Sequence, residues 1–276
     1  MHTHKAGDCR SRVHWQRASS VAATFIAAFL APYHFLVNAV HHQTTHLTSI
    51  HLSNDHGGRG KSSARLDAAQ NKEVDQTYRL VREIAERTII PLLRRVEAED
   101  QRRRLVCFDR RFKDANRLKH KVADQLRLAP SCTPSEGLAV IPDAVRFTLQ
   151  YLESDYVTGV RKDIERFRDR GCTLVAVRNA WAGDQYKGIN SRWRDPSSGL
   201  MFEVQFHTQD SLRARELTHR AYERIRGDTV MVEGTEMTTL RAFQRQVNAM
   251  VLIPPGALEI GESNGLWVYP AVLSPV

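Results

Sequence analysis

Residues 200–207 constrain this chain most, because a large apolar side chain stands at every second position. The apolar set is Leu200, Phe202, Val204 and Phe206, and the intervening set is Met201, Glu203, Gln205 and His207. A period of two predicts a β-strand with one buried face, and it gathers the acid, the amide and the imidazole on the other face. That second face is either the ordinary solvated side of an antiparallel strand or the floor of a polar site.

Further patterns along the chain predict a mixed α+β fold with helices packed on one face of a sheet. Asp195-Pro-Ser-Ser-Gly199 has strong turn chemistry and joins a strand at 189–194 to the strand above as a hairpin. Gly171 predicts the end of a helix. Apolar residues at helical spacing begin near Asp67 and continue past a kink at Pro91. The other expected elements are helices at 110–126, 157–170, 211–226 and 237–250, strands at 140–149 and 174–178, and a loop at 130–135.

Several motifs, in one consistent order, resemble the RelA/SpoT-type alarmone synthetases. Tyr186-Lys-Gly-Ile-Asn190 is similar to their Gly-Tyr-x-Ser-Ile-His segment, and Glu203-Val-Gln-Phe-His-Thr208 to their Glu-Val-Gln-Ile-Arg-Thr strand. Upstream, Arg117-Leu-Lys-His-Lys121 resembles their Arg-x-Lys element, and Asp143-Ala-Val-Arg-Phe-Thr148 resembles their Asp-x-x-x-x-Arg strand with its metal-binding Asp. Residues 216–223 resemble the helix that follows. The resemblance covers residues 71–262, and the His-Asp hydrolase domain of the long family members is not seen.

The resemblance implies a nucleotidyltransferase-like fold, a mixed β-sheet flanked by helices, and an ATP-dependent diphosphotransferase. Such an enzyme moves pyrophosphate from ATP to the 3′-hydroxyl of a purine nucleotide and releases AMP. Charge on the transferred group calls for fixed cations and a divalent ion. Mg²⁺ takes oxygen ligands, often one or two carboxylates. Asp143 and Glu203 are therefore the expected metal-binding and catalytic pair, and Glu203 alternatively holds or deprotonates the attacking hydroxyl.

The resemblance also assigns the substrate-binding residues. The ATP-binding set is Arg117, Lys119, Lys121 and Arg146, and the acceptor-binding set is Tyr186, Arg178, Lys187, Asn190, Gln205 and His207. On the expected helix, Arg117 and Lys121 share a face and Lys119 points elsewhere. The family places a phosphate against Lys119 and the adenine against Arg117. Tyr186 is expected to stack on the acceptor base; without the resemblance it is equally a hairpin aromatic packed on the sheet.

The departures from the family pattern bear on the acceptor. Asp184-Gln185 replaces the family's Asn-Gly, Asn190 replaces its His, and His207 replaces its Arg. The first change predicts a broader choice of purine. The net charge of +9 favours anionic partners. Two alternatives therefore stay open: a toxin that pyrophosphorylates a nucleotide pool or the 3′ end of a tRNA, and a non-catalytic basic module that binds nucleotides or nucleic acid, whose RNA contacts would be salt-sensitive.

The N-terminus has the pattern of an export signal. A basic stretch precedes the apolar run 21–30, and a small-residue cleavage site ends at Ala39. We expect residues 1–39 to be a signal peptide, the alternative being a membrane anchor, 40–70 a polar His-rich leader, and 263–276 a C-terminal tail. The mature chain would then be secreted, without stable membrane association, and similar to secreted ATP:nucleotide 3′-pyrophosphokinases. It would keep Cys107, Cys132 and Cys172, which allow at most one intramolecular disulfide.

Overall fold

The computed structural model describes residues 65–226 and 234–261. The helices are α3 (Ala68–Arg87), α4 (Ile89–Ala98), α5 (Ala115–Leu128), α6 (Pro134–Ala139), α7 (Tyr156–Asp169), α8 (Gln209–Arg226) and α9 (Gly234–Ala249). The strands are β1 (Arg103–Val106), β2 (Arg146–Tyr151), β3 (Thr173–Asn179), β4 (Ile189–Arg194) and β5 (Met201–Thr208). They form one sheet in the order β1-β2-β5-β4-β3, in which β2 and β5 are parallel and the other pairs antiparallel. The predicted α+β class with a mixed sheet flanked by helices is confirmed.

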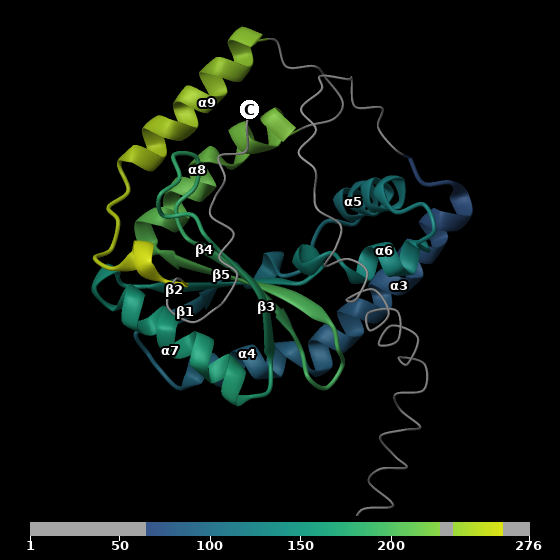
Figure 1. Cartoon of the computed structure of the whole chain (residues 1–276), viewed down its shortest axis with the longest axis horizontal. Helices are drawn as coiled ribbons and strands as arrows, with labels where there is room; N and C mark the ends of the chain where they lie inside the picture. Colours follow the sequence, from purple (N-terminus) through teal and green to yellow (C-terminus); the bar gives the residue numbers. More distant parts are fainter. Residues whose placement is uncertain (1–64, 227–233, 262–276) are drawn as a thin grey trace, which may run out of the picture. The chain divides into compact units, whose positions relative to one another are not determined.

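The apolar face of the sheet packs against α4 and α7. Phe202, Val204 and Phe206 of β5 are completely buried. Phe167 of α7 lies with its ring centroid 5.0 Å from that of Trp193 on β4. Helices are not confined to this face, contrary to the sequence prediction, because α8 and α9 lie on the other side of the sheet (Figure 1).

The β4–β5 hairpin is the best-predicted part of the fold. β4 spans the predicted residues 189–194, and the turn closes by a 3.0 Å hydrogen bond from Asp195 N–H to Leu200 O. The Asp195 carboxylate accepts from Ser198 N–H at 2.9 Å, and Gly199 adopts a positive φ of 69°. These are the local interactions by which Asp, Ser and Gly favour turns. The hairpin therefore fixes the register that places Glu203 on its face of the sheet.

Four elements differ from the sequence predictions. The predicted strand 140–149 begins only at Arg146, and Asp143 lies before it in a 3-10 turn, Pro142–Ala144. The helix expected from residue 110 begins at Ala115, because the Asp114 side chain caps it. Residues 130–135 are not all loop, since α6 starts at Pro134. The break expected at Pro91 falls at Thr88, because proline lacks the N–H that would bond to the carbonyl four residues earlier.

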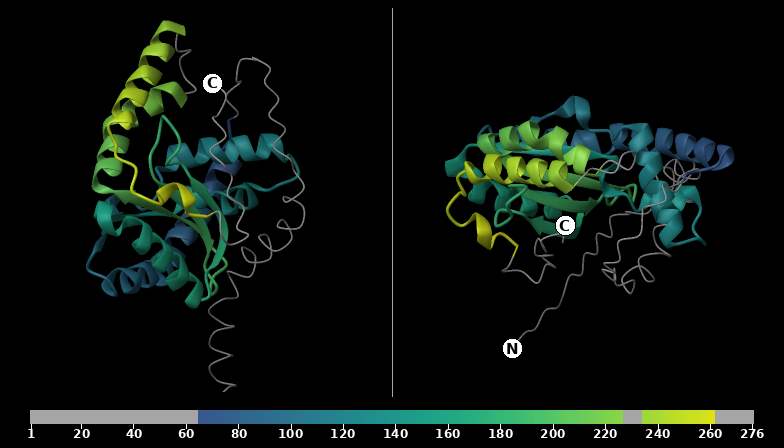
Figure 2. Two further views of the ribbon diagram at one scale, coloured as in Figure 1. Left: turned by 60° about the vertical axis from the view of Figure 1, so that its left-hand side comes forward. Right: turned by 90° about the horizontal axis from the view of Figure 1, so that it is seen from above.

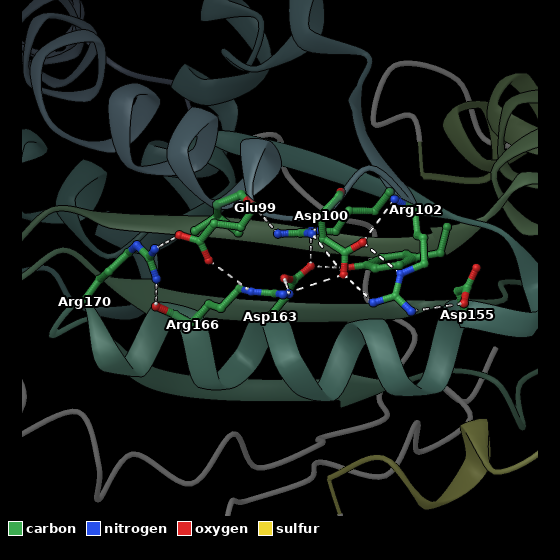
Figure 3. A network of polar contacts seen from close by, with 10 residues as sticks. Glu99, Asp100, Arg102, Asp155, Asp163, Arg166 and Arg170 are labelled. Atoms are coloured by element: carbon green, nitrogen blue, oxygen red, sulfur yellow. Dashed lines mark hydrogen bonds and ion pairs between the residues drawn. The ribbon is translucent and has the colours of Figure 1, made fainter.

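Strand β1 was not predicted, because its sequence lies in a run of basic residues. Arg103 nevertheless has a buried side chain that forms an ion pair with Asp163 of α7, with 2.6 Å between Nε and Oδ2. Asp163 also accepts hydrogen bonds from the Tyr151 hydroxyl at 2.6 Å and from Arg166 at 2.7 Å. These contacts belong to a polar network between the edge of the sheet and α7 (Figure 3). A charged residue in this strand is therefore part of the core.

Helices α8 and α9 pack side by side and lead to the C-terminal end of the described chain (Figure 2). There the Asn179 side chain at the end of β3 donates to the carbonyls of Ala257 and Ile260, at 2.7 and 3.1 Å. Within residues 65–226 and 234–261, we find no helix with the length and apolarity needed to cross a membrane. The predicted signal peptide, most of the leader and the C-terminal tail lie outside the described residues.

Candidate active site

The polar face of the sheet carries the predicted site in two adjoining rows. Paired residues on neighbouring strands project to the same side. The first row aligns Glu203 of β5 with Arg146 of β2 and Arg192 of β4. The second row runs across the sheet through Thr148, Gln205, Asn190 and Arg178. The shared face that the alternating pattern of β5 predicted for Glu203, Gln205 and His207 is confirmed.

Asp143, just before β2, is held between two lysines. Lys113 Nζ lies 2.8 Å from Oδ2, and Lys121 Nζ lies 2.7 Å from Oδ2 and 2.9 Å from Oδ1. The backbone brings Lys113 here, because its N–H donates to the Ala144 carbonyl at 3.1 Å. Burial raises the pKa of Asp143, but Lys121 and Lys113 outweigh burial and lower it to about 2. Asp143 is therefore a carboxylate at neutral pH, surrounded by positive charge.

Glu203 differs from Asp143, because its pKa is raised and not lowered. Burial and the charge of Asp143 both raise the pKa of Glu203, while Arg146 and Arg192 oppose them only in part. Its Oε1 accepts a 2.8 Å hydrogen bond from Gln205 Nε2, which fixes the carboxylate on the floor. A raised pKa makes the carboxylate a better proton acceptor than an exposed glutamate. The two acids thus differ in pKa, as is common where two carboxyl groups have different chemical roles.

Arginines from three strands and one helix lie on or near the polar floor. Arg146 and Arg192 flank Glu203 in register, Arg178 lies on β3, and Arg215 approaches from α8. Burial raises the pKa of the Tyr186 hydroxyl group, and the charges of Arg215, Arg146 and Arg178 oppose this rise. The three arginines therefore lie near one centre. Fixed cations converging on a polar floor suit the charges of a polyphosphate.

Tyr186 stands beside this floor with its hydroxyl group held from two sides. The hydroxyl donates to Asn190 Oδ1 at 2.7 Å and lies 2.8 Å from His207 Nε2. The rings of Tyr186 and His207 meet edge to face, with 5.4 Å between their centroids. Tyr186 is only half-buried, so part of the residue remains exposed. Stacking on a base remains a prediction.

Two residues assigned to acceptor binding are turned away from it. His207 is 0% exposed, and its second ring nitrogen, Nδ1, lies 2.9 Å from Ser211 Oγ, so neither nitrogen is left for a ligand. Lys187 is buried, and its Nζ donates to the Trp181 carbonyl at 2.9 Å. The prediction that these two side chains contact the acceptor is therefore corrected: they support the segment that carries Tyr186.

The predicted ATP-binding residues of α5 separate in space. Lys121 reaches Asp143, whereas Lys119 Nζ bonds to Asp75 of α3 at 2.8 Å and does not join the site. The phosphate role assigned to Lys119 therefore fits Lys121 better. Arg117 is exposed and forms an ion pair with Glu223 of α8. The predicted division of helix faces, with Arg117 and Lys121 on one and Lys119 on another, is confirmed.

The donor set fits a hard divalent cation better than a softer metal. Among the residues the structure describes, no three His, Cys, Asp or Glu side chains gather as a complete metal site. The site instead offers two carboxylates that repel each other, Asp143 and Glu203. Gln205 adds an oxygen, since its buried Oε1 has no hydrogen-bond partner within the described chain. Mg²⁺ commonly binds to one or two carboxylates, and phosphate oxygens complete its coordination shell.

Three cationic residues of the site were missed in the sequence. Arg192 could have been found, because it lies two residues after Asn190 on a predicted strand and so shares its face. Lys113 lies in a long basic run where nothing in the pattern separates it from its neighbours. Arg215 reaches the floor only because α8 crosses this side of the sheet, which the sequence pattern does not show.

Comparison with known proteins gives similarity in structure only. No family model and no curated protein sequence matches the chain. The small alarmone synthetase 1 from Bacillus subtilis, bound to its product pppGpp, is 15% identical with a TM-score of 0.42, over 71% of this chain and 99% of that one. The small alarmone synthetase 2 from Bacillus subtilis is 12% identical with a TM-score of 0.41, over 70% and 98%.

A GTP pyrophosphokinase family protein from Streptococcus pneumoniae is 12% identical with a TM-score of 0.41, over 71% of this chain and 93% of that one. The three structures named here are two small alarmone synthetases and a GTP pyrophosphokinase family protein.

Proposed function

We propose that this protein transfers pyrophosphate from ATP to the 3′-hydroxyl of a purine nucleotide and releases AMP. One observation carries the proposal: Asp143 and Glu203, acids of opposite pKa shift, share a polar floor onto which arginines from β2, β3, β4 and α8 converge. The motifs that resemble the alarmone synthetases place the same two acids at the reaction centre. A non-catalytic module that binds anions would gain nothing from Asp143 and Glu203, whose negative charges repel each other on this floor.

The reaction forms one bond and breaks one. The acceptor 3′-oxygen attacks the β-phosphorus of ATP, and the bond from that phosphorus to the oxygen bridging the α- and β-phosphates breaks. The bridging oxygen leaves with AMP. In our proposal Glu203 takes the proton of the attacking hydroxyl, a role that its raised pKa favours. The hydrogen bond from Gln205 holds the accepting carboxylate in place.

The cations have distinct tasks in this scheme. Lys113 and Lys121, which form ion pairs with Asp143, would turn to the phosphates when substrate binds. Arg146 lies in register beside Glu203 and would stabilise charge that develops at the transferred group. A divalent ion, most simply Mg²⁺, would be held by Asp143 and the phosphate oxygens and would neutralise their charge, while the Glu203 carboxylate accepts the proton.

The products decide between this function and its alternatives. We would incubate the purified protein with Mg²⁺, ATP labelled at the γ-phosphate, and in turn AMP, ADP, GDP, GTP or a tRNA. We expect a labelled purine nucleotide and an equal amount of AMP. Release of ADP instead would show single phosphoryl transfer, and label on tRNA alone would support the toxin alternative. No transfer to any acceptor would refute the proposal.

Two lysines of α5 provide a matched pair of variants. Lys121 contacts Asp143 and Lys119 contacts Asp75, yet they are two residues apart on one helix. We expect Lys121→Ala to lower kcat/KM for ATP by at least about tenfold, which is the loss of one charge-assisted contact. Lys119→Ala should stay within about twofold of the native protein. Equal losses in both variants would show that α5 acts only through stability.

We also propose that the mature chain is exported, on the basis of the N-terminal pattern. N-terminal sequencing of the protein from the culture medium should begin close to residue 40. Soluble protein that retains Met1 inside the cell would contradict export, and it would leave the proposed reaction untouched.

A further inference from the structure

A chain of directed hydrogen bonds runs beneath the polar floor and ends on Tyr186. The Tyr186 hydroxyl has one proton, which it donates to Asn190 Oδ1 at 2.7 Å. The 2.8 Å contact between this hydroxyl and His207 must therefore be donated by His207 Nε2. The neutral ring then has a bare Nδ1, which accepts from Ser211 Oγ at 2.9 Å, a shorter contact than the 3.2 Å to the Thr208 carbonyl that competes for the one serine proton. Ser211 Oγ in turn accepts from the Thr208 N–H at 3.0 Å.

The surroundings of the imidazole enclose it on several sides and favour its neutral form. His207 is completely buried, and burial disfavours a charged ring, so the imidazole stays neutral. Gly188 lies directly against it: a β-carbon at that position would lie 2.9 Å from His207 Cε1 and 3.0 Å from Nδ1. The glycine has a φ of 140°, which favours this residue as well. The backbone is thus shaped to admit the ring.

From this geometry we infer that His207 is a positioning residue, whose Nε2–H holds the Tyr186 ring at the angle at which it receives the acceptor base. The inference rests on the proposed function, because the acceptor is what the ring would receive. It assigns His207 an indirect part in acceptor affinity and none in proton transfer. It also accounts for Asn190 and His207 together, since both bind the same hydroxyl group.

Two variants of His207 separate positioning from packing. His207→Gln keeps a donor that can take the place of Nε2–H, whereas His207→Leu has similar bulk and no donor. We expect His207→Leu to raise the acceptor KM about tenfold, with kcat and the KM for ATP within about twofold, as for a lost interaction that is uniform in ground and transition state. His207→Gln should stay within about threefold in all three constants.

Tyr186→Phe supplies the control, because it removes the hydroxyl through which His207 acts. In that background the Gln and Leu variants should have the same acceptor KM, since effects within one hydrogen-bond network are not additive. A difference that survives Tyr186→Phe, or equal KM values for Gln and Leu in the native background, would overturn the inference. If His207→Leu does not fold, the comparison of His207→Gln with and without Tyr186→Phe still tests the inference.

A spectroscopic readout separates this inference from the proposed function. Long-range ¹H–¹⁵N correlation spectra, with the His207 signals assigned by their loss in His207→Gln, should show a protonated Nε2 and a bare Nδ1 from pH 6 to 8. The opposite tautomer would refute the hydrogen-bond chain whatever the activity. The predicted tautomer in a native protein that transfers no pyrophosphate would refute the proposed function and leave the chain intact.

Discussion

Asp143 and Asp163 are both largely buried aspartates held by two basic side chains, yet they differ in almost every other respect. Asp143 is paired with lysines beside the polar face, and its side chain is 14% exposed. Asp163 lies on α7 under the apolar face, is 0% exposed and is paired with Arg103 and Arg166. The pKa of Asp143 is lowered, whereas burial raises that of Asp163 despite its hydrogen bond from Tyr151 and its two arginines.

The difference separates a cluster that can rearrange from one that cannot. Lysine is a point charge on a flexible stem, whereas the guanidinium plane fixes several donors at once. Asp163 belongs to a continuous network with Glu99, Asp100, Arg102 and Arg170 (Figure 3). Asp143 has only its two lysines as direct ion-pair partners among the described residues. We therefore infer that the Asp163 cluster is structural and that the Asp143 cluster is a site whose cations can move to a ligand.

The largest effect is expected for Asp143→Asn. Losing this carboxylate removes metal ligation and misplaces Lys113 and Lys121, so transfer should fall by at least about 1000-fold. The far-UV circular dichroism spectrum should not change. Activity within about tenfold of the native protein would show that Asp143 is not part of the reaction centre. The two aspartates would then not differ in function.

Asp163→Asn should lower the stability of the protein and leave its activity intact. Because burial raises the pKa of Asp163, loss of the charge alone should not destabilise the fold. The amide N–H, however, replaces an oxygen that accepts from Tyr151 or Arg166 and leaves a buried donor unpaired, which should cost about 1–3 kcal/mol of unfolding free energy. Urea unfolding would measure this. The kcat per folded molecule should stay close to the native value. A stable Asp163→Asn protein with impaired kcat would reverse the roles that we assign to the two aspartates.

The dependence of the unfolding free energy on pH should show how much the ion pairs of Asp143 contribute to stability. Because its folded-state pKa of about 2 is below the unfolded value, its ionised form stabilises the fold at neutral pH and the contribution declines as pH falls from about 4 through about 2. The unfolding free energies of the native protein and Asp143→Asn, measured without divalent ions, should differ by about 2 kcal/mol at pH 6. The gap should narrow at pH 3. A constant gap would mean that the ion pairs with Lys113 and Lys121 contribute nothing.

The smallest effect concerns the choice of base. Stacking on Tyr186 accepts any purine, and the Asn-Gly of relatives is Asp184-Gln185 here. Adenine and guanine acceptors should therefore differ by less than about tenfold in kcat/KM, or about 1.4 kcal/mol. Tyr186→Ala should weaken both alike, by about 1–3 kcal/mol. A preference for GDP or GTP above about a hundredfold would show that Asp184 supplies a selective contact to guanine.

The sequence predicted the parts of the fold where a local pattern coincides with the tertiary structure. The alternation of large apolar side chains located β5 and its polar face, and turn residues located the hairpin. It failed where packing overrides the pattern: β1 was missed because Arg103 is charged and yet buried against Asp163. The motif residues Asp143 and Glu203 do come together. His207 and Lys187 were misassigned, because a sequence does not show which polar side chains are buried by their neighbours.

The central claim is that the polar floor is a reaction centre, and Glu203→Gln tests it most directly. Because burial and Asp143 raise the pKa of Glu203, its ionised form opposes folding, so the neutral amide should leave the thermal unfolding temperature equal or higher. Transfer of label from γ-labelled ATP to a purine nucleotide should fall by at least about 1000-fold in the same preparation. A Glu203→Gln protein that transfers pyrophosphate at near-native rates would contradict the account.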